Sequence, residues 1–260
     1  GLSLLEAQEA AKRVDMLFPL SLASEGSAQV GGAISTNAGG MTVLKYGSMR
    51  DLVLGLEWVS ADGVIHSSLS GLRKDNTGYA LHSLITGSEG TLGVITAACL
   101  KLYPKPVDSQ VALCSVTSVE NAISLLELLR ELDLPVSTFE FAHKTGVSLV
   151  PRHNPLDHSD NIWLVLLQVD GGSRVGSLRA PLEEALQRAD EHGILDDCVL
   201  ASDGAQAASL RALREGLSEA TTRAGVSIKH DISVPIHKIP DFLRRADAAV
   251  AQTYPGARPI

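Results

Sequence analysis

The sequence predicts an α+β protein of two domains in its 260 residues. Two glycine-rich clusters punctuate the first hundred residues, and the double proline of Pro104-Lys105-Pro106 follows them. Beyond the prolines, the pattern changes to strands alternating with amphipathic helices in the order β-α-β-β-α-β, which is typical of a ferredoxin-like domain. We therefore expect one domain over residues 1–106 and a second over residues 107–260.

The first domain is expected to open with a helix over residues 2–17, because apolar residues recur near 3.6 spacing and Phe18-Pro19-Leu20 then ends the helix. Asp62-Gly63 is a hairpin signal between two strand candidates. The strands are predicted over residues 52–60, 64–66 and 94–103, the last of them long and buried. Polar turns are expected over residues 45–51 and 73–79, and a short helix over residues 81–85.

The second domain has strand patterns over residues 111–116, 136–141, 162–169, 198–200 and 226–230. Helices are predicted over residues 119–132, 144–150, 205–224 and 239–253, and a further one runs from the cap Ser173 to about His192. Ser118 supplies the N-cap of the first helix, whose apolar positions form one face.

Composition and charge exclude several classes of function. A formal net charge of −8 opposes nucleic-acid binding, which needs clustered Lys and Arg. No apolar run approaches the roughly 18–20 residues of a membrane span, and the first residues lack the pattern of a signal peptide. Cys99, Cys114 and Cys198 stand far apart in apolar stretches, so we expect core thiols of a reducing compartment rather than disulfides or metal ligands.

Common catalytic and metal motifs are missing from the sequence. The eight histidines include no His-x-x-x-His pair on a shared element, and His153 and His158 lie five apart in a loop, which favours no metal site. Gly87-Ser88-Glu89-Gly90 lacks the spacing of a nucleophile elbow. Neither a P-loop motif nor GxGxxG occurs, so the ordinary nucleotide-binding folds lack support.

The two glycine clusters, residues 30–40 and 87–93, are predicted to form loops. A glycine backbone adopts positive φ and approaches a ligand closely, and successive N–H groups form a concave site for an anion or heteroatom. Ser35, Thr36 and Asn37 add short donors and acceptors. The two clusters together predict one extended ligand contacted at two places. The alternative is that individual glycines serve tight turns only.

Ordered motifs over residues 18–104 resemble the FAD-linked oxidases of the vanillyl-alcohol oxidase and p-cresol methylhydroxylase (PCMH) superfamily. The matching motifs are Phe18-Pro19-Leu20, Gly31-Gly32, Thr36-Asn37-Ala38-Gly39-Gly40, Tyr46-Gly47, Arg50-Asp51, Gly55-Leu56-Glu57, Ala61-Asp62-Gly63, and the stretches 73–79 and 87–96. Among the branches, the chain is most similar to the D-2-hydroxy-acid dehydrogenases, such as D-lactate and D-2-hydroxyglutarate dehydrogenase and the glycolate oxidase FAD subunit. Ala80 departs from the family, which usually has an acidic residue there.

The resemblance implies that the first domain is the C-terminal part of a PCMH-type FAD-binding domain and that the second is a substrate-binding cap. It implies FAD contacts along both clusters, at Gly31, Gly32, Thr36, Asn37 and Gly39 and at Gly90, Thr91, Gly93, Val94 and Ile95. The family also has an N-terminal FAD subdomain and, downstream, a Gly-His-x-Gly-Asp-Gly-Asn-x-His segment with metal-binding and catalytic histidines. We therefore expect an internal fragment with no catalytic residue or metal ligand of its own. A divalent metal such as Zn²⁺ would be bound by residues beyond it.

The resemblance also implies a substrate site at Arg214, Ser218 and Lys229. Arg214 and Ser218 are four residues apart on one predicted helix and project from one face, and a guanidinium grips a carboxylate at two points. The alternative for Arg214 is a surface ion pair with Glu215 or Glu219. His230, beside Lys229, is expected to be an orienting or buried residue rather than a catalytic base.

The implied reaction is the FAD-dependent oxidation of a D-2-hydroxy acid, such as D-lactate, D-2-hydroxyglutarate or glycolate, to the 2-oxo acid, with hydride transfer to flavin N5. A separate acceptor (a quinone, a cytochrome or an electron-transfer flavoprotein) would reoxidise the flavin, in a bacterial cytoplasm or a mitochondrion. Three alternatives stay open: an FAD oxidase of a sugar or phenol, a non-catalytic binding subunit, and an isolated fragment that is inert. Nucleic acid is not an expected partner, and a homodimer is left open.

Overall fold

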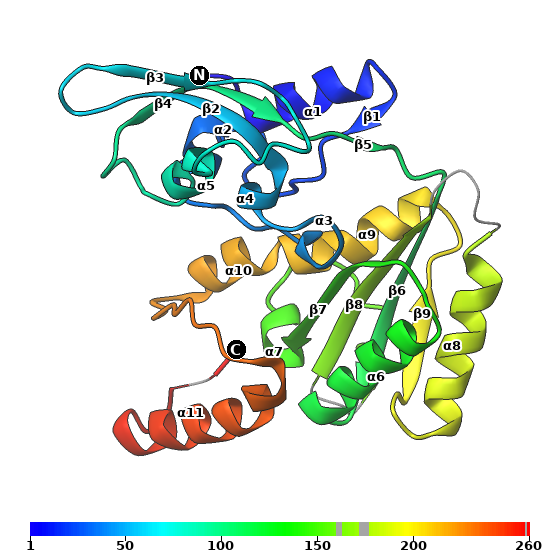
Figure 1. Cartoon of the computed structure of the whole chain (residues 1–260). Helices are drawn as coiled ribbons and strands as arrows, with labels where there is room; N and C mark the ends of the chain where they lie inside the picture. The colour runs from blue at the N-terminus through cyan, green and yellow to red at the C-terminus, as the bar shows by residue number, and fades with distance from the viewer. Residues whose placement is uncertain (160–162, 172–176, 258) are drawn as a thin grey trace. The chain divides into compact units, whose positions relative to one another are not determined.

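The computed structural model describes residues 1–159, 163–171, 177–257 and 259–260. It mixes helices with antiparallel strands, so the predicted α+β class is confirmed (Figure 1). The chain divides into two compact units, Gly1–Asp108 with Gly171 and Ser109–Asp170 with residues 177–260. Among the described helices, none combines the length and the apolar character needed to cross a bilayer.

The first unit opens with α1 (Leu4–Lys12), whose N-cap is Ser3. Asp15 then takes a left-handed φ of 56°. β1 (Met16–Leu17) follows and pairs antiparallel with β5 (Tyr103–Pro104). The helix predicted over residues 2–17 and the strand predicted over residues 94–103 are therefore both too long. Their last residues instead belong to β1 and β5, which pair with each other.

A three-stranded antiparallel sheet in the order β3-β2-β4 forms the centre of the first unit. Its strands are β2 (Val53–Val59), β3 (Ile65–Ser68) and β4 (Val94–Leu100). The hairpin predicted at Asp62-Gly63 is confirmed, and Gly63 has a positive φ of 81°, as such turns require. β4 is not the buried strand that we expected, because its residues are exposed or half-buried and Val94 is 68% exposed.

Short helices connect these strands: α2 (Val30–Ser35), α3 (Val43–Tyr46), α4 (Met49–Leu52) and α5 (Leu81–Ile85). α5 has its predicted bounds. The first glycine cluster, predicted as a loop, instead begins as the helix α2, and the turn predicted over residues 45–51 is helical at both ends. The side chains that the core of this unit buries almost completely are Leu4, Phe18, Leu20, Ile34, Met49, Leu52 and Leu56. Each contributes about 1.5–3 kcal/mol by leaving water.

The second unit is built on a sheet whose described strands lie in the order β7-β8-β6-β9. These strands are β6 (Asp108–Val116), β7 (Val136–His143), β8 (Trp163–Gly171) and β9 (Asp197–Leu200). α6 (Val119–Glu131) lies between β6 and β7 in the chain, and α8 (Arg179–Glu191) between β8 and β9 (Figure 1). Element order and strand order together confirm the predicted ferredoxin-like domain.

Both faces of this sheet are covered, because successive side chains of a strand point to opposite faces. One face packs against α6 and α8 through Ala112, Cys114, Val116, Val165, Leu167 and Val169. The other packs against α9 (Gly204–Glu215) through Val111, Leu113, Leu164 and Leu166. Ser118 caps α6 as predicted, and its Oγ accepts a hydrogen bond from the Asn121 N–H at 3.0 Å.

The helix predicted over residues 205–224 is interrupted at Gly216, which separates α9 from α10 (Leu217–Ala224). A Cβ at Gly216 would lie 2.8 Å from Cγ1 of Val150, so the missing side chain permits a close approach at the break. α7 (Lys144–Val147) ends three residues before the predicted end at residue 150.

The strand predicted over residues 226–230 is not formed in the described part of the chain. Ile228 is 73% exposed and Val226 is fully exposed, so the alternating pattern of this segment has no partner strand there. α11 (Ile239–Thr253) has its predicted bounds. The predicted cap Ser173 lies outside the described residues, and α8 begins only at Arg179.

Candidate functional site

The two glycine clusters lie side by side in the first unit, although some fifty residues separate them in the sequence. The Gly87 N–H donates to the Ile34 carbonyl at 3.0 Å, and the Glu89 N–H donates to the Ser35 carbonyl at 2.9 Å. These bonds satisfy carbonyls at the C-terminal end of α2, which a helix leaves without partners. One continuous surface therefore carries residues of both clusters.

Asn37 is the residue that ties this surface together. It adopts a left-handed φ of 49°, and its Oδ1 accepts from the Ser48 Oγ at 3.0 Å and from the Arg50 N–H at 2.9 Å. The Arg50 Nη2 donates in turn to the Thr86 carbonyl at 2.8 Å. The side-chain oxygen of Asn37 is thus used in hydrogen bonds within the unit. Its amide nitrogen has no hydrogen-bond partner among the described residues, so it is available to a ligand.

The hydroxyls of both clusters also bind to their own segments. The Thr36 Oγ1 donates to the Gly32 carbonyl at 3.0 Å, and the Thr91 Oγ1 donates to the Ser88 carbonyl at 2.6 Å. Each hydroxyl oxygen keeps acceptor capacity when its proton is used in this way. Both residues are exposed.

Two glycines of the second cluster are required by the fold itself. Gly90 has a φ of 79° and Gly93 a φ of 142°, which other residues rarely adopt. A Cβ at Gly93 would also lie 2.5 Å from the carbonyl oxygen of Val59. At these two positions the backbone conformation therefore explains the glycine without a ligand, as an alternative to the expected ligand contact.

Gly31 and Gly32 are different, because they lie inside α2 and have neither positive φ nor a crowded neighbour. A Cβ at Gly32 would have no heavy atom within 4 Å, and one at Gly31 would lie 3.8 Å from the carbonyl oxygen of Ile95. Glycine in a helix interior is destabilising by about 1 kcal/mol relative to alanine. The fold of the unit therefore gives no reason for these glycines, whereas a ligand lying against the helix does. Gly39 is intermediate, with a Val43 carbon 3.3 Å from its Cβ position.

In the second unit, Arg214 near the end of α9 forms an ion pair through its Nε with Oε2 of Glu140 on β7. The Arg214 side chain is 39% exposed and that of Glu140 is 25% exposed. The surface pairing with Glu215 or Glu219 considered from the sequence is therefore wrong. Arg211, one turn earlier, is also bound to the sheet, since its Nε donates to the Gln168 Oε1 at 2.8 Å.

Ser218 and Lys229 are brought together at α10. The Lys229 Nζ lies 3.3 Å from the Ser218 carbonyl, 3.5 Å from the Ser218 Oγ and 3.0 Å from the Thr222 Oγ1. Arg214 and Ser218, however, do not share one continuous helix, because the break at Gly216 lies between them. His230 was expected to be an orienting or a buried residue, and because it is exposed the buried alternative is wrong.

The described residues of the second unit also form a cleft of about 520 Å³ that the sequence did not reveal. Its charged lining residues are Arg152, Glu215, Glu219 and Arg223, and the last two form an ion pair at 2.6 Å. None of the three residues predicted to bind substrate lines this cleft. Its lining includes Gly216, at the break between α9 and α10, which no local signal in the sequence marked beyond the glycine itself.

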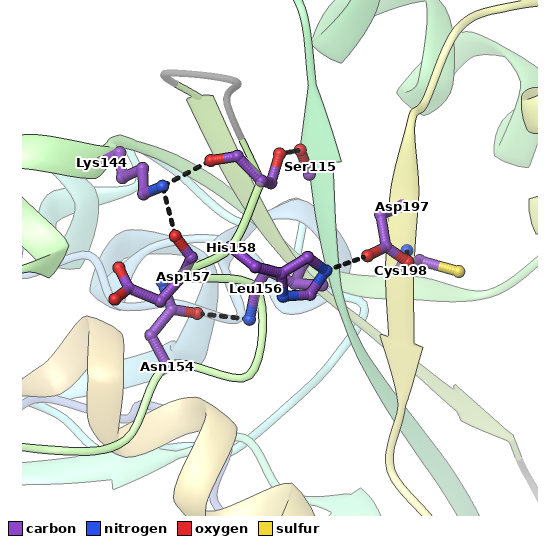
Figure 2. Close-up of polar contacts among 9 residues, drawn as sticks. Ser115, Lys144, Asn154, Leu156, Asp157, His158, Asp197 and Cys198 are labelled. Carbon is purple, nitrogen blue, oxygen red and sulfur yellow. Dashed lines mark hydrogen bonds and ion pairs between the residues drawn. The ribbon is translucent and has the colours of Figure 1, made fainter.

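The polar loop after α7 is fastened to the sheet by side chains (Figure 2). The Lys144 Nζ donates to the carbonyls of Asp157, at 2.6 Å, and of Ser159, and His158 Nε2 lies 3.0 Å from Asp197 Oδ2. His158 is thus engaged by a carboxylate of β9. Within the described ranges, no group of three or more His, Cys, Asp or Glu side chains is arranged to hold a metal ion.

Two models of protein families match different parts of the chain. The model of the C-terminal domain of FAD linked oxidases matches residues 105–254, and an FAD binding domain model matches residues 1–68. D-2-hydroxyglutarate dehydrogenases from Arabidopsis thaliana and Rattus norvegicus, both named mitochondrial, are similar proteins. They are 38% identical over 229 residues and 37% identical over 248 residues, which cover 86% and 94% of this chain and 41% and 46% of theirs. A D-2-hydroxyglutarate dehydrogenase from Xanthomonas citri pv. viticola is 32% identical over 255 residues, which cover 98% of this chain and 54% of its own.

Among solved structures, alkyldihydroxyacetonephosphate synthase shares the fold. One crystal form matches with a TM-score of 0.68 at 16% identity, over 97% of this chain and 51% of that one. A second matches with a TM-score of 0.63 over 83% and 41%. At this identity the likeness concerns the fold alone. The chain spans about half the length of the curated relatives it matches.

Proposed function

The chain belongs to the FAD-linked oxidases, and we propose that the protein oxidises a D-2-hydroxy acid to the 2-oxo acid with FAD as its cofactor. The substrate class is supported by the similar proteins, which are named D-2-hydroxyglutarate dehydrogenases. In this proposal the first unit is the C-terminal part of the FAD-binding domain, and the second is the substrate-binding cap.

The observation that carries the cofactor assignment is the pair of helical glycines, Gly31 and Gly32, for which the fold gives no reason. Their open backbone fits the close approach of a flat, extended group. The residues that would hold FAD are Gly31, Gly32, Thr36, Asn37 and Gly39 from one cluster and Gly90, Thr91, Gly93, Val94 and Ile95 from the other. Bound FAD supplies the acceptor for the hydride that the substrate carbon releases.

Arg214 would bind the substrate carboxylate. Its ion pair with Glu140 uses Nε. Neither terminal nitrogen of the guanidinium has a partner among the described residues, so both can donate hydrogen bonds to the two oxygens of one carboxylate. Glu140 fixes the plane of the guanidinium before substrate arrives. This is a positioning role, and positioning the reacting C–H bond lowers the barrier of the chemical step.

Ser218 and Lys229 would complete the substrate site. The Lys229 ammonium has three donors, and in this structure three oxygens of α10 surround it. Binding a carboxylate therefore requires Lys229 to exchange at least one of these contacts. No residue of the chain is assigned as the base that removes the hydroxyl proton.

The electrons would leave to a separate acceptor: a quinone, a cytochrome or an electron-transfer flavoprotein. We propose a mitochondrial location for a eukaryotic source, because the Arabidopsis and rat relatives are named mitochondrial, and a cytoplasmic one for a bacterial source.

A dye-coupled assay of the purified protein tests the substrate class. D-lactate, D-2-hydroxyglutarate and glycolate are compared with L-lactate, a sugar alcohol and a phenol at equal concentrations. We expect dye reduction with at least one D-2-hydroxy acid or glycolate, and none with the last three. Turnover of only the sugar alcohol or the phenol would replace the hydroxy-acid proposal, and no turnover of any compound by FAD-loaded protein would favour a binding subunit.

A further inference from the structure

Cys114 and Cys198 lie directly opposite each other in the second unit, although 84 positions separate them in the sequence. The register of the antiparallel pair β6 and β9 joins Leu113 with Val199 and Cys114 with Cys198. Both thiols point to the face of the sheet that α6 and α8 cover. No local pattern in the sequence indicates this proximity, because it depends on a long-range strand pairing.

The hydrogen-bond pattern shows which kind of cross-strand pair this is. The carbonyl of Val111 accepts from the Ala201 N–H at 2.9 Å, and that of Ser115 from the Asp196 N–H at 3.0 Å. Alternate residues of β6 therefore bond to β9. The Cys198 N–H instead donates to the Asp197 Oδ1 at 2.8 Å. Cys114 and Cys198 thus form a non-hydrogen-bonded pair.

Distance favours a covalent bond at such a pair. Opposed residues at non-hydrogen-bonded positions have Cα atoms about 4.5 Å apart and side chains that approach closely. Disulfides span Cα separations of about 4.4–6.8 Å. A non-hydrogen-bonded pair is therefore expected at the short end of that range, where a disulfide can form without moving the strands apart.

Access differs between the two thiols. Cys114 is fully buried, whereas Cys198 is half-buried and lies on β9, an edge strand of the described sheet. Figure 2 shows the Cys198 sulfur on the side of β9 opposite to the Asp197 carboxylate. Cys198 is therefore the thiol that a small oxidant reaches first.

The pKa shifts of the two cysteines also favour Cys198 as the reactive thiol. A hydrogen bond from Cys114 lowers the pKa of the Cys198 thiol, although partial burial and the carboxylates of Asp197 and Asp190 act in the opposite direction. The same hydrogen bond, together with complete burial, raises the pKa of Cys114. The two shifts therefore favour Cys198 over Cys114 as the thiol that loses its proton first, and the thiolate is the reactive form.

We propose that Cys114 and Cys198 are a redox pair that closes to a disulfide when the protein meets a hydroperoxide. The Cys198 thiolate attacks the outer peroxide oxygen, the O–O bond breaks, and Cys198 becomes a sulfenic acid. The departing alkoxide or hydroxide takes up the proton that the Cys198 thiol released and leaves as an alcohol or water. The Cys114 sulfur then attacks the Cys198 sulfur, an S–S bond forms, and the hydroxide leaves with the Cys114 proton as water. Two thiols lose two electrons and two protons in total, and a dithiol reverses the step by exchange.

The test treats the purified protein with hydrogen peroxide and, separately, with diamide, and then counts thiols after denaturation. The protein has three cysteines. We expect the count to fall from three to one with either oxidant and to return to three with dithiothreitol. Trypsin places the cysteines in separate peptides, within residues 75–101, 102–130 and 189–211. The linked pair should therefore join the last two peptides.

Variants separate the pair from general oxidation. Cys99→Ser is the matched control. This variant has two thiols and should lose both on oxidation, because Cys99 lies in the first unit and takes no part in the pair. Cys114→Ala should leave Cys198 to progress to sulfinic acid, which dithiothreitol does not reverse. Three thiols that survive both oxidants, or wild-type protein in which Cys198 is over-oxidised while Cys114 stays reduced, would overturn the proposal.

Discussion

The Nε of Arg214 binds the carboxylate of Glu140, a residue of β7 that lies 74 positions earlier in the chain. This contact joins the end of α9 to the sheet and fixes the plane of a guanidinium whose side chain is 39% exposed. This ion pair decides how variants of Arg214 and Glu140 should behave.

Replacing Arg214 with alanine should raise the KM for the hydroxy acid about 10- to 100-fold, because a hydrogen bond to a charged group contributes roughly 1.5–3 kcal/mol. Arg214→Lys should recover little, since an ammonium cannot grip a carboxylate at two points. Steady-state kinetics measure the effect. Arg211→Ala is the matched control, one turn away and bound to Gln168, and an equal rise in KM there would contradict a specific role for Arg214.

Glu140→Gln should raise the KM roughly 3- to 10-fold, less than the loss of Arg214, with kcat nearly unchanged. The amide oxygen can still accept from the Arg214 Nε, but the charge that holds the guanidinium is gone. Kinetics and thermal unfolding of the same variant are compared. If Glu140 only stabilises the fold, the melting temperature falls and the KM stays as in the wild type.

Gly32→Ala should change stability and cofactor binding in opposite directions. Without FAD, alanine should stabilise α2 by about 1 kcal/mol, which raises Tm by roughly 4–8 °C for a domain of this size. The added methyl should weaken FAD binding about tenfold, since overpacking typically costs 1–3 kcal/mol. Calorimetry and FAD titration give the two values.

Gly93→Ala provides the comparison for Gly32, because its φ of 142° and the nearby Val59 carbonyl already forbid a side chain. It should destabilise the protein without FAD. A Gly32→Ala variant that binds FAD as tightly as the wild type would show that the helical glycines do not face the cofactor.

Cys198 should react with iodoacetamide more slowly at neutral pH when Cys114 is replaced by alanine. The hydrogen bond from Cys114 lowers the pKa of Cys198, so removing it raises that pKa and reduces the thiolate fraction at a given pH. The rate profile should therefore shift to higher pH. A profile that stays in place, with Cys99→Ser as the control, would contradict the hydrogen bond.

Local patterns in the sequence predicted the elements that local forces determine. α5 and α11 have their predicted bounds, and the capped, amphipathic α6 ends within one residue of the expected position. The hairpin at Asp62-Gly63 follows from turn chemistry alone. The family resemblance read from the ordered motifs is confirmed as well.

The errors arose where distant segments decide the outcome. The pairing of β1 with β5 removes residues from both a predicted helix and a predicted strand. The first glycine cluster becomes helical where Gly87 and Glu89 bind the end of α2. The alternation over residues 226–230 predicts a strand only if a partner is present, and the described residues supply none.

For the candidate substrate site, the family resemblance named residues but no geometry. The motifs pointed to Ser218 and Lys229, which do meet at α10. Neither the partner of Arg214 nor the break at Gly216 could be deduced, because that partner lies on β7, far away in the sequence, and a single glycine does not by itself mark a helix break.

An anaerobic absorption spectrum of the FAD-loaded protein, recorded before and after each enantiomer of 2-hydroxyglutarate and of lactate, tests the central claim most directly. The account predicts that a D acid bleaches the flavin band and that its L enantiomer does not, with the bleaching weakened in Arg214→Ala. A flavin band that every D-2-hydroxy acid and glycolate leave unchanged, while a phenol or sugar bleaches it, would contradict the account.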